Sequence, residues 1–509
     1  MKVNQLKAGA ALSYASMVIG YIVSIIYTPM MLRLLGQSEY GLYNLVASIV
    51  AYLGVLNFGF GSTYMRYYTR YKVLNDREKI AALNGMFLII FSIIGLIAVI
   101  AGAILAFNTE LIFGVELTDN ELSRAKILMI ILVLNLAISF PSIVFNSHII
   151  ANEEFVFQKF IQMIKTVINP FIILPILLMG YGSVGMVVVT TIFNLIIEIT
   201  NMTFCIKKLN MKFSFRSLEI KLMKEMTIFS SYIFLYMVVD QINWNVDKFI
   251  LGRHKGTSEV AIYSIGAQLN TYLISISTVI SSVFIPRVNS IVAKNSKDRE
   301  LTTLFIKIGR IQYIFVLLVI IGFIVFGRSF INLWAGENYL VSYYVATVLM
   351  IPMLTSLIQN IGIEIRKAQN KHKTAAFFMT LVACINILIS IPLAKYYGAI
   401  GSAIGTSIAV IINQIFINVY YHKVIGLDIL LFWKEIIQLS KGAFIPICTA
   451  IVMMMNKNHF ADLTFLLLAI PFSVLYLLSM YKFGLNNFEK KLFFNDNLKK
   501  LSITNLRKS

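Results

Sequence analysis

The stretch LNGMFLIIFSIIGLIAVIAGAILAF, residues 83–107, contains no charged side chain. As a helix, a stretch of this length crosses the roughly 30 Å of hydrocarbon in a bilayer. Similar stretches recur throughout the 509 residues, which are 58% hydrophobic and 13% charged, with a mean hydropathy of +0.79. Water-soluble domains do not have this composition. The sequence therefore predicts an integral membrane protein built of helices, because lipid cannot satisfy an open backbone.

The fold class expected from this pattern is an all-α polytopic membrane protein with about fourteen transmembrane helices. The expected spans are 10–33, 41–63, 83–107, 125–149, 160–179, 183–206, 226–251, 259–286, 308–330, 341–363, 374–396, 398–421, 436–456 and 460–482. Short turns at Gly180–Gly182 and at Tyr397–Gly398 separate two pairs of spans that almost touch in sequence.

The net charge of +20 is concentrated in alternate loops and in the C-terminal tail. The basic groups are Arg66, Arg70, Lys72, Arg77 and Lys79; Lys207, Lys208, Lys212, Arg216, Lys221 and Lys224; Arg287, Lys294, Lys297, Arg299, Lys307 and Arg310; Arg366, Lys367, Lys371 and Lys373; and Lys490, Lys491, Lys499, Lys500, Arg507 and Lys508. Because Lys and Arg favour cytoplasmic loops, both termini are expected to face the cytoplasm. The basic excess indicates contact with anionic lipids, and no nucleic-acid partner is predicted.

Signals for an enzyme are weak. The three cysteines are widely spaced within or beside apolar spans, and the five histidines have no partner at ligand spacing, so neither a metal site nor a catalytic residue is predicted. The glycines of GYGSVG, residues 180–185, match a dinucleotide-binding pattern but lack the surrounding strands and helix. They are interpreted as a tight turn. No cofactor is expected other than a coupling ion, Na⁺ or H⁺.

The chain repeats itself at a fixed offset. Gly36 and Gly252, in the related stretches LRLLGQSEYGLYNLVA and KFILGRHKGTSEVAIYSIGA, are 216 residues apart, and Gly182 and Gly398 have the same separation. Six helices separate the two copies, so both cross the membrane in the same direction. We expect two six-helix lobes, 1–217 and 218–433, with two additional helices in 434–485 and a basic tail in 486–509. Such an arrangement suits alternating access.

The chain resembles the Wzx-type polysaccharide flippases. The resemblance rests on LGQSEYGLYNLVASIVAYLGVLNFGFGSTYMRYYTRY (35–71), on DKFILG (247–252) and on the paired YG turns, and it covers essentially the whole chain. These flippases belong to the superfamily of multidrug, oligosaccharidyl-lipid and polysaccharide exporters. The resemblance implies a bacterial cytoplasmic-membrane protein that moves an undecaprenyl-pyrophosphate-linked oligosaccharide from the inner to the outer leaflet, with a glycan polymerase or ligase as possible further partner.

The span at 226–251 carries charges within an apolar stretch. At 100° per residue, Asp240, Asn243, Trp244 and Asp247 fall on one helical face. A charge at mid-bilayer costs about 2.5 to 3.5 kcal/mol on insertion scales, so this face is expected to line a watery cavity or to be paired. The alternative is a structural salt bridge, formed by Asp247 with either Lys248 or Arg33.

Two kinds of binding residue are predicted. Resemblance to lipid II flippases implies a coupling-ion site, for which the candidates are Asp240, Asp247, Asn386 and Thr406. A pyrophosphate requires cations in the cleft, and Lys or Arg supplies charge-assisted hydrogen bonds. The candidates for substrate binding are Lys165, Arg33, Arg66, Asn243, Trp244 and Lys248. Lys165 is the leading candidate, although a structural pair with Glu198 is an alternative, and Arg66 is also interpreted as a topology anchor.

Two other functions are compatible with a chain of this kind. A cation-coupled multidrug exporter of the same superfamily is the first, but drug exporters often carry an acidic residue in their first helix and residues 10–32 contain none. A membrane glycan polymerase or ligase is the second. Its catalytic residues would require a long outer loop, whereas the longest predicted here is 108–124.

Overall fold

The structure is a computed structural model, and it describes residues 5–215, 220–294, 298–369, 371, 373–455 and 464–494. The basic tail predicted for 486–509 therefore lies mostly outside the described residues. The helices form two compact units. The first contains Met1–Ser264 and Ala383–Ser402, and the second contains Ile265–Val382 and Ala403–Ser509. The predicted lobe boundaries after 217 and 433 stay predictions.

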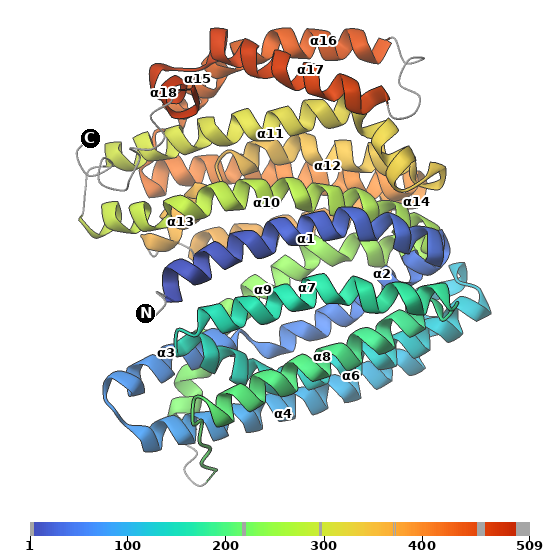
Figure 1. Ribbon diagram of the computed structural model, residues 1–509, viewed down its shortest axis with the longest axis vertical. Coiled ribbons are helices and arrows are strands. Elements are labelled where there is room, and N and C mark those ends of the chain that lie inside the picture. Colours follow the sequence, from blue (N-terminus) through green and yellow to red (C-terminus); the bar gives the residue numbers. More distant parts are fainter. Residues whose placement is uncertain are drawn as a thin grey trace. The chain divides into compact units, whose positions relative to one another are not determined.

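The first unit is built mainly from the N-terminal helices. These are α1 (Gln5–Leu35), α2 (Gln37–Leu53), α3 (Phe60–Val73), α4 (Arg77–Phe107), α5 (Thr109–Phe113), α6 (Asp119–Ala151), α7 (Phe155–Leu178), α8 (Gly182–Lys207) and α9 (Ile220–Lys255). Helix α6 packs between α4 and α8, α7 packs along α1, and α9 packs against α2 (Figure 1). The α6, α7 and α8 helices thus form a contiguous group, which holds the candidate site.

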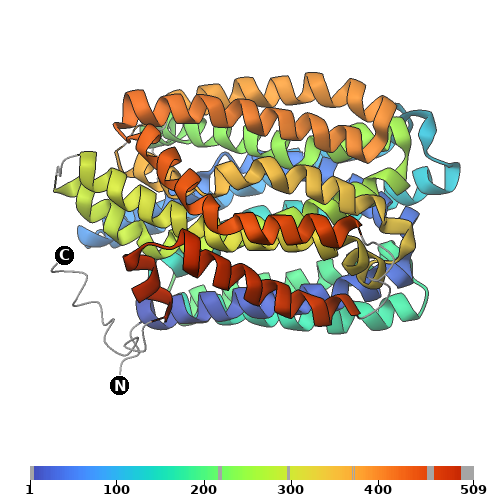
Figure 2. The same ribbon diagram turned by 90° about the horizontal axis from the view of Figure 1, so that it is seen from above.

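The second unit contains the C-terminal helices. These are α11 (Asp298–Trp334), α12 (Val341–Leu357), α13 (Ile361–Ala368), α15 (Ile429–Ser440), α16 (Phe444–Met455), α17 (Thr464–Ser479) and α18 (Asn487–Phe494), while α10 (Thr257–Ala293) and α14 (Lys373–Tyr420) contribute to both units. Helix α11 packs against α12, α15 and α17. Figure 2 shows α16 and α17, orange-red and red, side by side.

The membrane character of the helices is clear from their length and their exposed faces. Within the described ranges, 12 helices are long and apolar enough to cross a membrane. One of them contains two predicted spans, 374–396 and 398–421, because Gly398 (φ 58°, ψ −139°) interrupts α14. Helix α9 covers the predicted span 226–251. The prediction of an all-α, multi-pass membrane protein is confirmed for the described residues.

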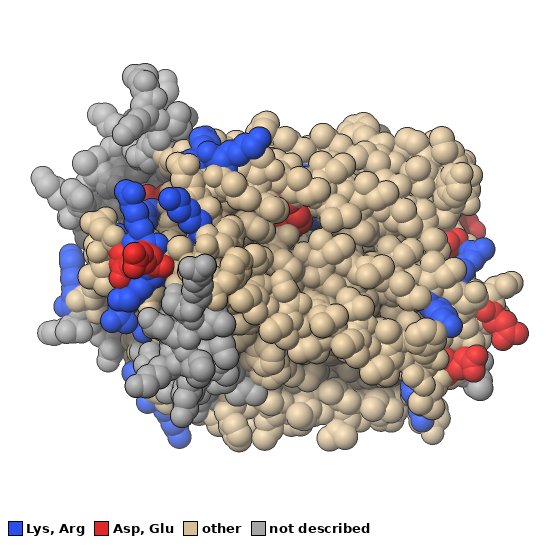
Figure 3. Space-filling model, turned by 90° about the horizontal axis from the view of Figure 1, so that it is seen from below, with Lys and Arg blue, Asp and Glu red and all other residues tan. Residues whose placement is uncertain are grey.

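The surface has the charge distribution expected of such a protein. On the face drawn in Figure 3, charged side chains gather at the two ends, and the band between them is almost uncharged. Helix α4 exposes a row of large apolar side chains, which are Ile93, Leu96, Ile97, Ile100 and Ile104. In water such a row would be a liability, but against lipid it leaves no polar group unsatisfied.

The second span is not the continuous helix that the sequence predicted for 41–63. Helix α2 ends at Leu53, a 3-10 turn follows at Gly54–Asn57, and α3 begins at Phe60. Gly59 has φ 68°, and any Cβ there would collide with Ile233 of α9. A glycine is required at this position because only it accepts both the left-handed backbone and the close approach. Hydropathy did not reveal this break.

The internal repeat is visible in two matching turns. Gly182 opens α8 with φ 58°, and the backbone N–H of Ser183 donates to Glu39 Oε1 at 2.7 Å. Gly398 has the same φ of 58°, and the N–H of Ala399 donates to Glu259 Oε2 at 2.6 Å. In each copy, a glutamate in the first turn of one helix accepts from the free N–H of another helix start. These equivalent contacts support the internal repeat.

The turns also correct one part of the predicted register. The sequence paired Gly36 with Gly252, but Gly252 lies inside α9. The equivalent of Gly36 (φ 76°) is Gly256 (φ 83°), since each precedes the helix that carries the capping glutamate. Their separation is 256 − 36 = 220, compared with 398 − 182 = 216 for the other pair. The second copy therefore has four fewer residues between its two turns, 398 − 256 = 142 compared with 182 − 36 = 146 in the first copy.

Candidate polar site within the first unit

Lys165 and Glu198 face the same small cavity between α6, α7 and α8. The cavity measures about 100 Å³ and is lined by Asn135, Ile138, Ser139, Lys165, Thr191, Asn194, Leu195 and Glu198. At 1.5 Å per residue, Lys165 lies about 15 Å along α7 from Phe155, and Glu198 lies about 14 Å along α8 from Lys207. Both charges therefore lie well inside apolar, span-length helices. Charges at such depth are characteristic of functional sites in membrane proteins.

The polar groups of this cavity are only partly satisfied. Asn135 Nδ2 donates to Thr191 Oγ1 at 2.9 Å, and Asn201 approaches Glu198 Oε2 at 3.5 Å. The buried Oδ1 of Asn194 has no hydrogen-bond partner. In the described part of the chain, Lys165 makes no hydrogen bond and no ion pair within 4.0 Å. No contact ion pair thus joins Lys165 and Glu198, although the two side chains line the same cavity and interact electrostatically across it, so the alternative of a structural pair stays open.

Glu198 also borders a second, apolar hollow. This groove has a volume of about 540 Å³ and is lined by side chains of α4, α6 and α8, among them Leu96, Leu134, Phe145 and Ile199. Ile138 and Leu195 line both the groove and the polar cavity, as Glu198 does. The Glu198 carboxyl group thus lies at the boundary between a polar space and an apolar one.

The predicted polar face of α9 is divided along its length. Asp240, Asn243 and Trp244 are exposed, and Trp244 Nε1 donates to Asp240 Oδ1 at 3.1 Å. Asp247 is only 1% exposed and accepts hydrogen bonds from the hydroxyl groups of Tyr263 and Ser402, each at 2.6 Å. The two aspartates therefore occupy different environments, although helical periodicity places them on one face.

The remaining predicted residues lie at separate places in the fold. Lys248 is half-buried in α9, where the charge of Asp247 acts on it. Asn386 is buried in α14 and accepts a hydrogen bond from Ser390 at 2.9 Å, whereas Thr406 belongs to the second unit. Arg33, in the last turn of α1, and Arg66, in α3, are exposed. Among the candidates for substrate binding, Lys165 lines the polar cavity and shares it with a second charge.

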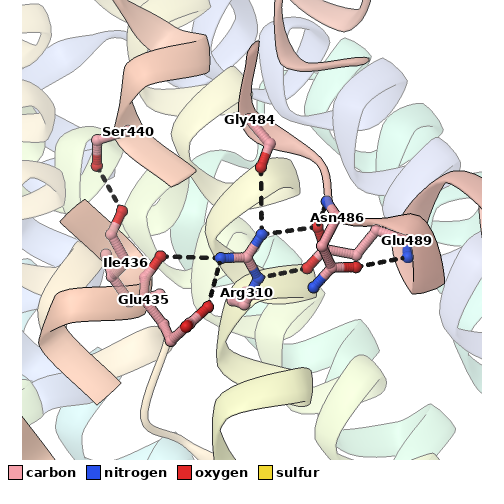
Figure 4. Close-up of polar contacts among 7 residues, drawn as sticks. All are labelled: Arg310, Glu435, Ile436, Ser440, Gly484, Asn486 and Glu489. Atoms are coloured by element: carbon pink, nitrogen blue, oxygen red, sulfur yellow. Dashed lines mark hydrogen bonds and ion pairs between the residues drawn. The ribbon is translucent and has the colours of Figure 1, made fainter. Parts of the chain in front are cut away.

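A buried ionic cluster in the second unit was missed by the sequence analysis, which placed Arg310 among the surface charges of a loop. Arg310 is 3% exposed and donates from Nε and Nη2 to the two carboxylate oxygens of Glu489. Nη1 donates to the backbone oxygen and to Oε2 of Glu435, at 2.9 and 3.1 Å, and Nη2 donates to Gly484 O at 3.2 Å (Figure 4). All five N–H groups of the guanidinium are satisfied.

This cluster fixes the C-terminal helix α18. Asn486 and Glu489 exchange hydrogen bonds between side chain and backbone, each at 2.9 Å, which caps the start of α18 (Figure 4). The arrangement joins α11, α15 and α18 within the second unit. Only the number of charges in 307–310 and 489–491 could have signalled it, because the partners are 179 residues apart.

The fold and the site together define a class. An all-helical, multi-pass chain with an internal repeat and charges deep within its spans has the features of a membrane transporter. The chain belongs to the family of polysaccharide biosynthesis proteins, whose family model matches residues 6–292.

Relatives and solved structures agree with this assignment. The chain is 24% identical over 404 residues to a putative O-antigen transporter of Shigella flexneri, covering 77% of this chain and 91% of that protein. It is 21% identical over 464 residues to the uncharacterized membrane protein EpsK of Bacillus subtilis (strain 168), covering 87% and 88%.

Two solved structures share the fold. The inward closed conformation of the lipid II flippase MurJ superposes with a TM-score of 0.74 at 18% identity, over 92% of this chain and 97% of that one. An inward-facing multidrug-resistance MATE transporter of the MOP superfamily gives 0.65 at 14% identity, over 79% and 98%. The family prediction is thus confirmed at the level of the polysaccharide biosynthesis proteins, and the transporter and flippase names among the relatives and structural neighbours agree with the prediction of a Wzx-type protein that is not an enzyme.

Proposed function

We propose that this protein is a flippase that moves an undecaprenyl-pyrophosphate-linked oligosaccharide from the inner to the outer leaflet of a bacterial cytoplasmic membrane by alternating access. Membership of the polysaccharide biosynthesis family supports this proposal, as do the names of an O-antigen transporter among its relatives and of a lipid II flippase among its structural neighbours. Both termini would face the cytoplasm, as the distribution of Lys and Arg predicts.

The observation that carries the proposal is the position of Lys165. Its ammonium group lines a polar cavity within the spans and has no hydrogen-bonding partner in the described part of the chain. A lysine held in this way has its three N–H donors available for an anionic oxygen, and charge-assisted hydrogen bonds to phosphate are strong where water is scarce. We assign the pyrophosphate to Lys165.

The other predicted residues keep subsidiary roles in this proposal. Arg33, Arg66 and Lys248 would attract the pyrophosphate along its path, while Asn243 and Trp244, exposed beside each other on α9, would contact sugar rings. Transport would be driven by Na⁺ or H⁺. Of the four predicted coupling residues, Asp240, Asn386 and Thr406 keep that role in the proposal, whereas the two hydroxyl donors to Asp247 favour a structural role for it. A glycan polymerase or ligase would receive the product.

The test is transport of a fluorescent polyprenyl-pyrophosphate oligosaccharide in proteoliposomes, measured as the fraction of label accessible to an impermeant quencher. We expect the native protein to flip the lipid and Lys165→Ala to lose at least about tenfold in rate, equivalent to about 1.4 kcal/mol. Lys159→Ala is the matched control, because Lys159 is a partly buried lysine of the same helix, α7, that does not line the cavity and donates to Gln162 Oε1 at 3.3 Å.

Two results would contradict the proposal. A native protein that flips no lipid-linked glycan, yet accumulates a cationic dye in the same vesicles under an ion gradient, would indicate the multidrug exporter instead. Equal loss of flipping in Lys159→Ala and Lys165→Ala would show that any charge on α7 serves, which removes the assigned role of the cavity.

A further inference from the structure

Glu198 has two neighbouring environments of opposite character. On one side is the polar cavity that it shares with Lys165, and on the other is the apolar groove between α4, α6 and α8. An ionised carboxylate beside an apolar groove is destabilised unless a cation or strong donors face it. Asn201 donates only a long hydrogen bond to Glu198, at 3.5 Å, and the hydroxyl group of Ser142 is the other nearby donor. Two states are therefore favourable: ionised with Lys165 close by, or protonated.

In the described part of the chain, Lys165 is the cation that lines a hollow together with Glu198, so its position favours one of these states over the other. Among the residues that line the two hollows, Lys165 and Glu198 are the charged ones. Two further helices pack against α8. The expected span of α1 carries no charge over residues 10–32, and on α2 the acid Glu39 accepts hydrogen bonds from Ser183 at the far end of α8. The charges of α4 lie in its first turn, at Arg77, Glu78 and Lys79.

The cavity between the two groups has room for a further polar group. Its volume of about 100 Å³ corresponds to about three water molecules at roughly 30 Å³ each. It also presents the unpartnered Oδ1 of Asn194. The site is therefore open, with donors on Lys165 and an acceptor on Asn194 both unused in the described residues.

Resting on the proposed function, we propose that Glu198 is the proton-carrying partner of Lys165, and that substrate phosphate and the Glu198 carboxylate compete for the Lys165 ammonium group. When phosphate binds to Lys165, Glu198 takes one proton from water and becomes neutral. When phosphate leaves, Glu198 releases that proton and faces Lys165 as an anion again. No bond other than O–H forms or breaks.

The physical reason is the repulsion of two anions around a single cation. Within apolar, span-length helices, a phosphate and a carboxylate that share one ammonium group repel each other, so protonation of the carboxylate lowers the energy of the bound state. Binding and protonation are then linked, so that phosphate binding takes up a proton and the affinity rises as the pH falls. Transport in one direction would thereby be coupled to proton movement at the substrate site itself, independently of the residues predicted on α9.

The experiment measures binding of farnesyl pyrophosphate to the full chain in nanodiscs, by calorimetry in two buffers of different ionisation enthalpy and at several pH values. We expect the native protein to take up close to one more proton per bound ligand than the Glu198→Gln variant does. For each unit by which the pH is lowered, the Kd of the native protein should fall by up to about tenfold relative to the Kd of that variant. The pyrophosphate of the ligand also takes up protons, but this contribution is the same for both proteins and cancels in the comparison with Glu198→Gln.

Matched variants separate this role from a structural one. Lys165→Gln should lose binding at every pH, whereas Lys165→Arg should keep binding and its proton uptake. Glu78→Gln removes an exposed acid in the first turn of α4 and should behave as the native protein. Thermal melts of each variant establish that it is folded.

The inference is overturned if Glu198→Gln and the native protein take up the same number of protons, if Lys165→Gln binds normally, or if farnesyl pyrophosphate does not bind. Each of these results is compatible with native flipping of a lipid-linked oligosaccharide in the vesicle assay. Failure of the inference can therefore be distinguished from failure of the proposed function, which would appear as loss of native flipping itself.

Discussion

The Arg310 cluster of the second unit and the Lys165–Glu198 cavity of the first unit are made of the same chemistry, a cation with carboxylate in an apolar protein. In the Arg310 cluster every guanidinium N–H has an acceptor, and the guanidinium group contacts both carboxylates directly (Figure 4). In the cavity, the ammonium and carboxylate groups are not in contact, and about 100 Å³ of space adjoins them.

This difference indicates which charges hold the fold and which are free to act. A fully satisfied buried charge can change its partners only at the full energy of desolvation, so it behaves as a structural element. A partly satisfied charge beside a cavity can accept a ligand or a proton without breaking existing bonds. Asp247, which has two hydroxyl donors, falls on the structural side of this division, while Lys165 and Glu198 fall on the other.

The largest effect is expected from Arg310→Ala. The substitution leaves Glu489 buried without its cation, which should destabilise the protein by about 3–5 kcal/mol. The measurement is the free energy of unfolding in mixed micelles. Arg287→Ala is the matched control, since its ion pair with Glu300 at 3.1 Å is exposed and should contribute about 0–1 kcal/mol. Equal losses in the two variants would break the comparison.

A smaller loss is expected from Asp247→Ala. The hydroxyl groups of Tyr263 and Ser402 would each lose their acceptor, at about 1–3 kcal/mol per stranded group. Unfolding in mixed micelles measures this effect as well, and Asp240→Ala, which alters an exposed side chain, should lie within about 0.5 kcal/mol of the native protein. If both variants were equally stable, Asp247 would belong with Lys165 and Glu198, the partly satisfied charges, and not with the structural ones.

Glu198→Gln should alter stability by less than about 1 kcal/mol, because no short hydrogen bond or contact ion pair is lost. The same substitution should nevertheless reduce the pH dependence of flipping, measured in the vesicle assay. Glu198→Gln would then change function without a large loss of stability, whereas Arg310→Ala should reduce stability and function together. A large loss of stability in Glu198→Gln would place the cavity with the structural clusters.

The smallest effect is expected at the partly exposed Asp76, which caps α4. Its pKa is lowered because the backbone N–H of Lys79 donates to Asp76 Oδ1 at 3.0 Å, with the ammonium group of Lys79 nearby. A carboxyl group whose pKa is lower in the folded state stabilises the protein above its unfolded pKa, and this stabilisation is lost as the pH falls through the folded pKa. The melting temperature of Asp76→Asn should therefore approach that of the native protein in acid. A constant difference at all pH values would contradict this explanation.

Hydropathy and glycine patterns predicted much of the fold. The spans follow from lengths of uncharged sequence that must be helical in lipid, and the turns at Gly182 and Gly398 follow from glycines that alone adopt φ 58° without strain. The site was predicted in part: Lys165 and Glu198 were considered as a pair, since each is a lone charge within a span. The open cavity between them could not be predicted.

What the sequence by itself determined is thus the all-helical membrane architecture, the internal repeat and the family, because these depend on local composition and on motifs that lie close together in the chain. Tertiary structure decided the break between α2 and α3, the four-residue difference in the repeat, the burial of Arg310 and the division between Asp240 and Asp247. The physical reason is that burial and pairing depend on which helix faces meet, and those faces come from residues as distant as Arg310 and Glu489.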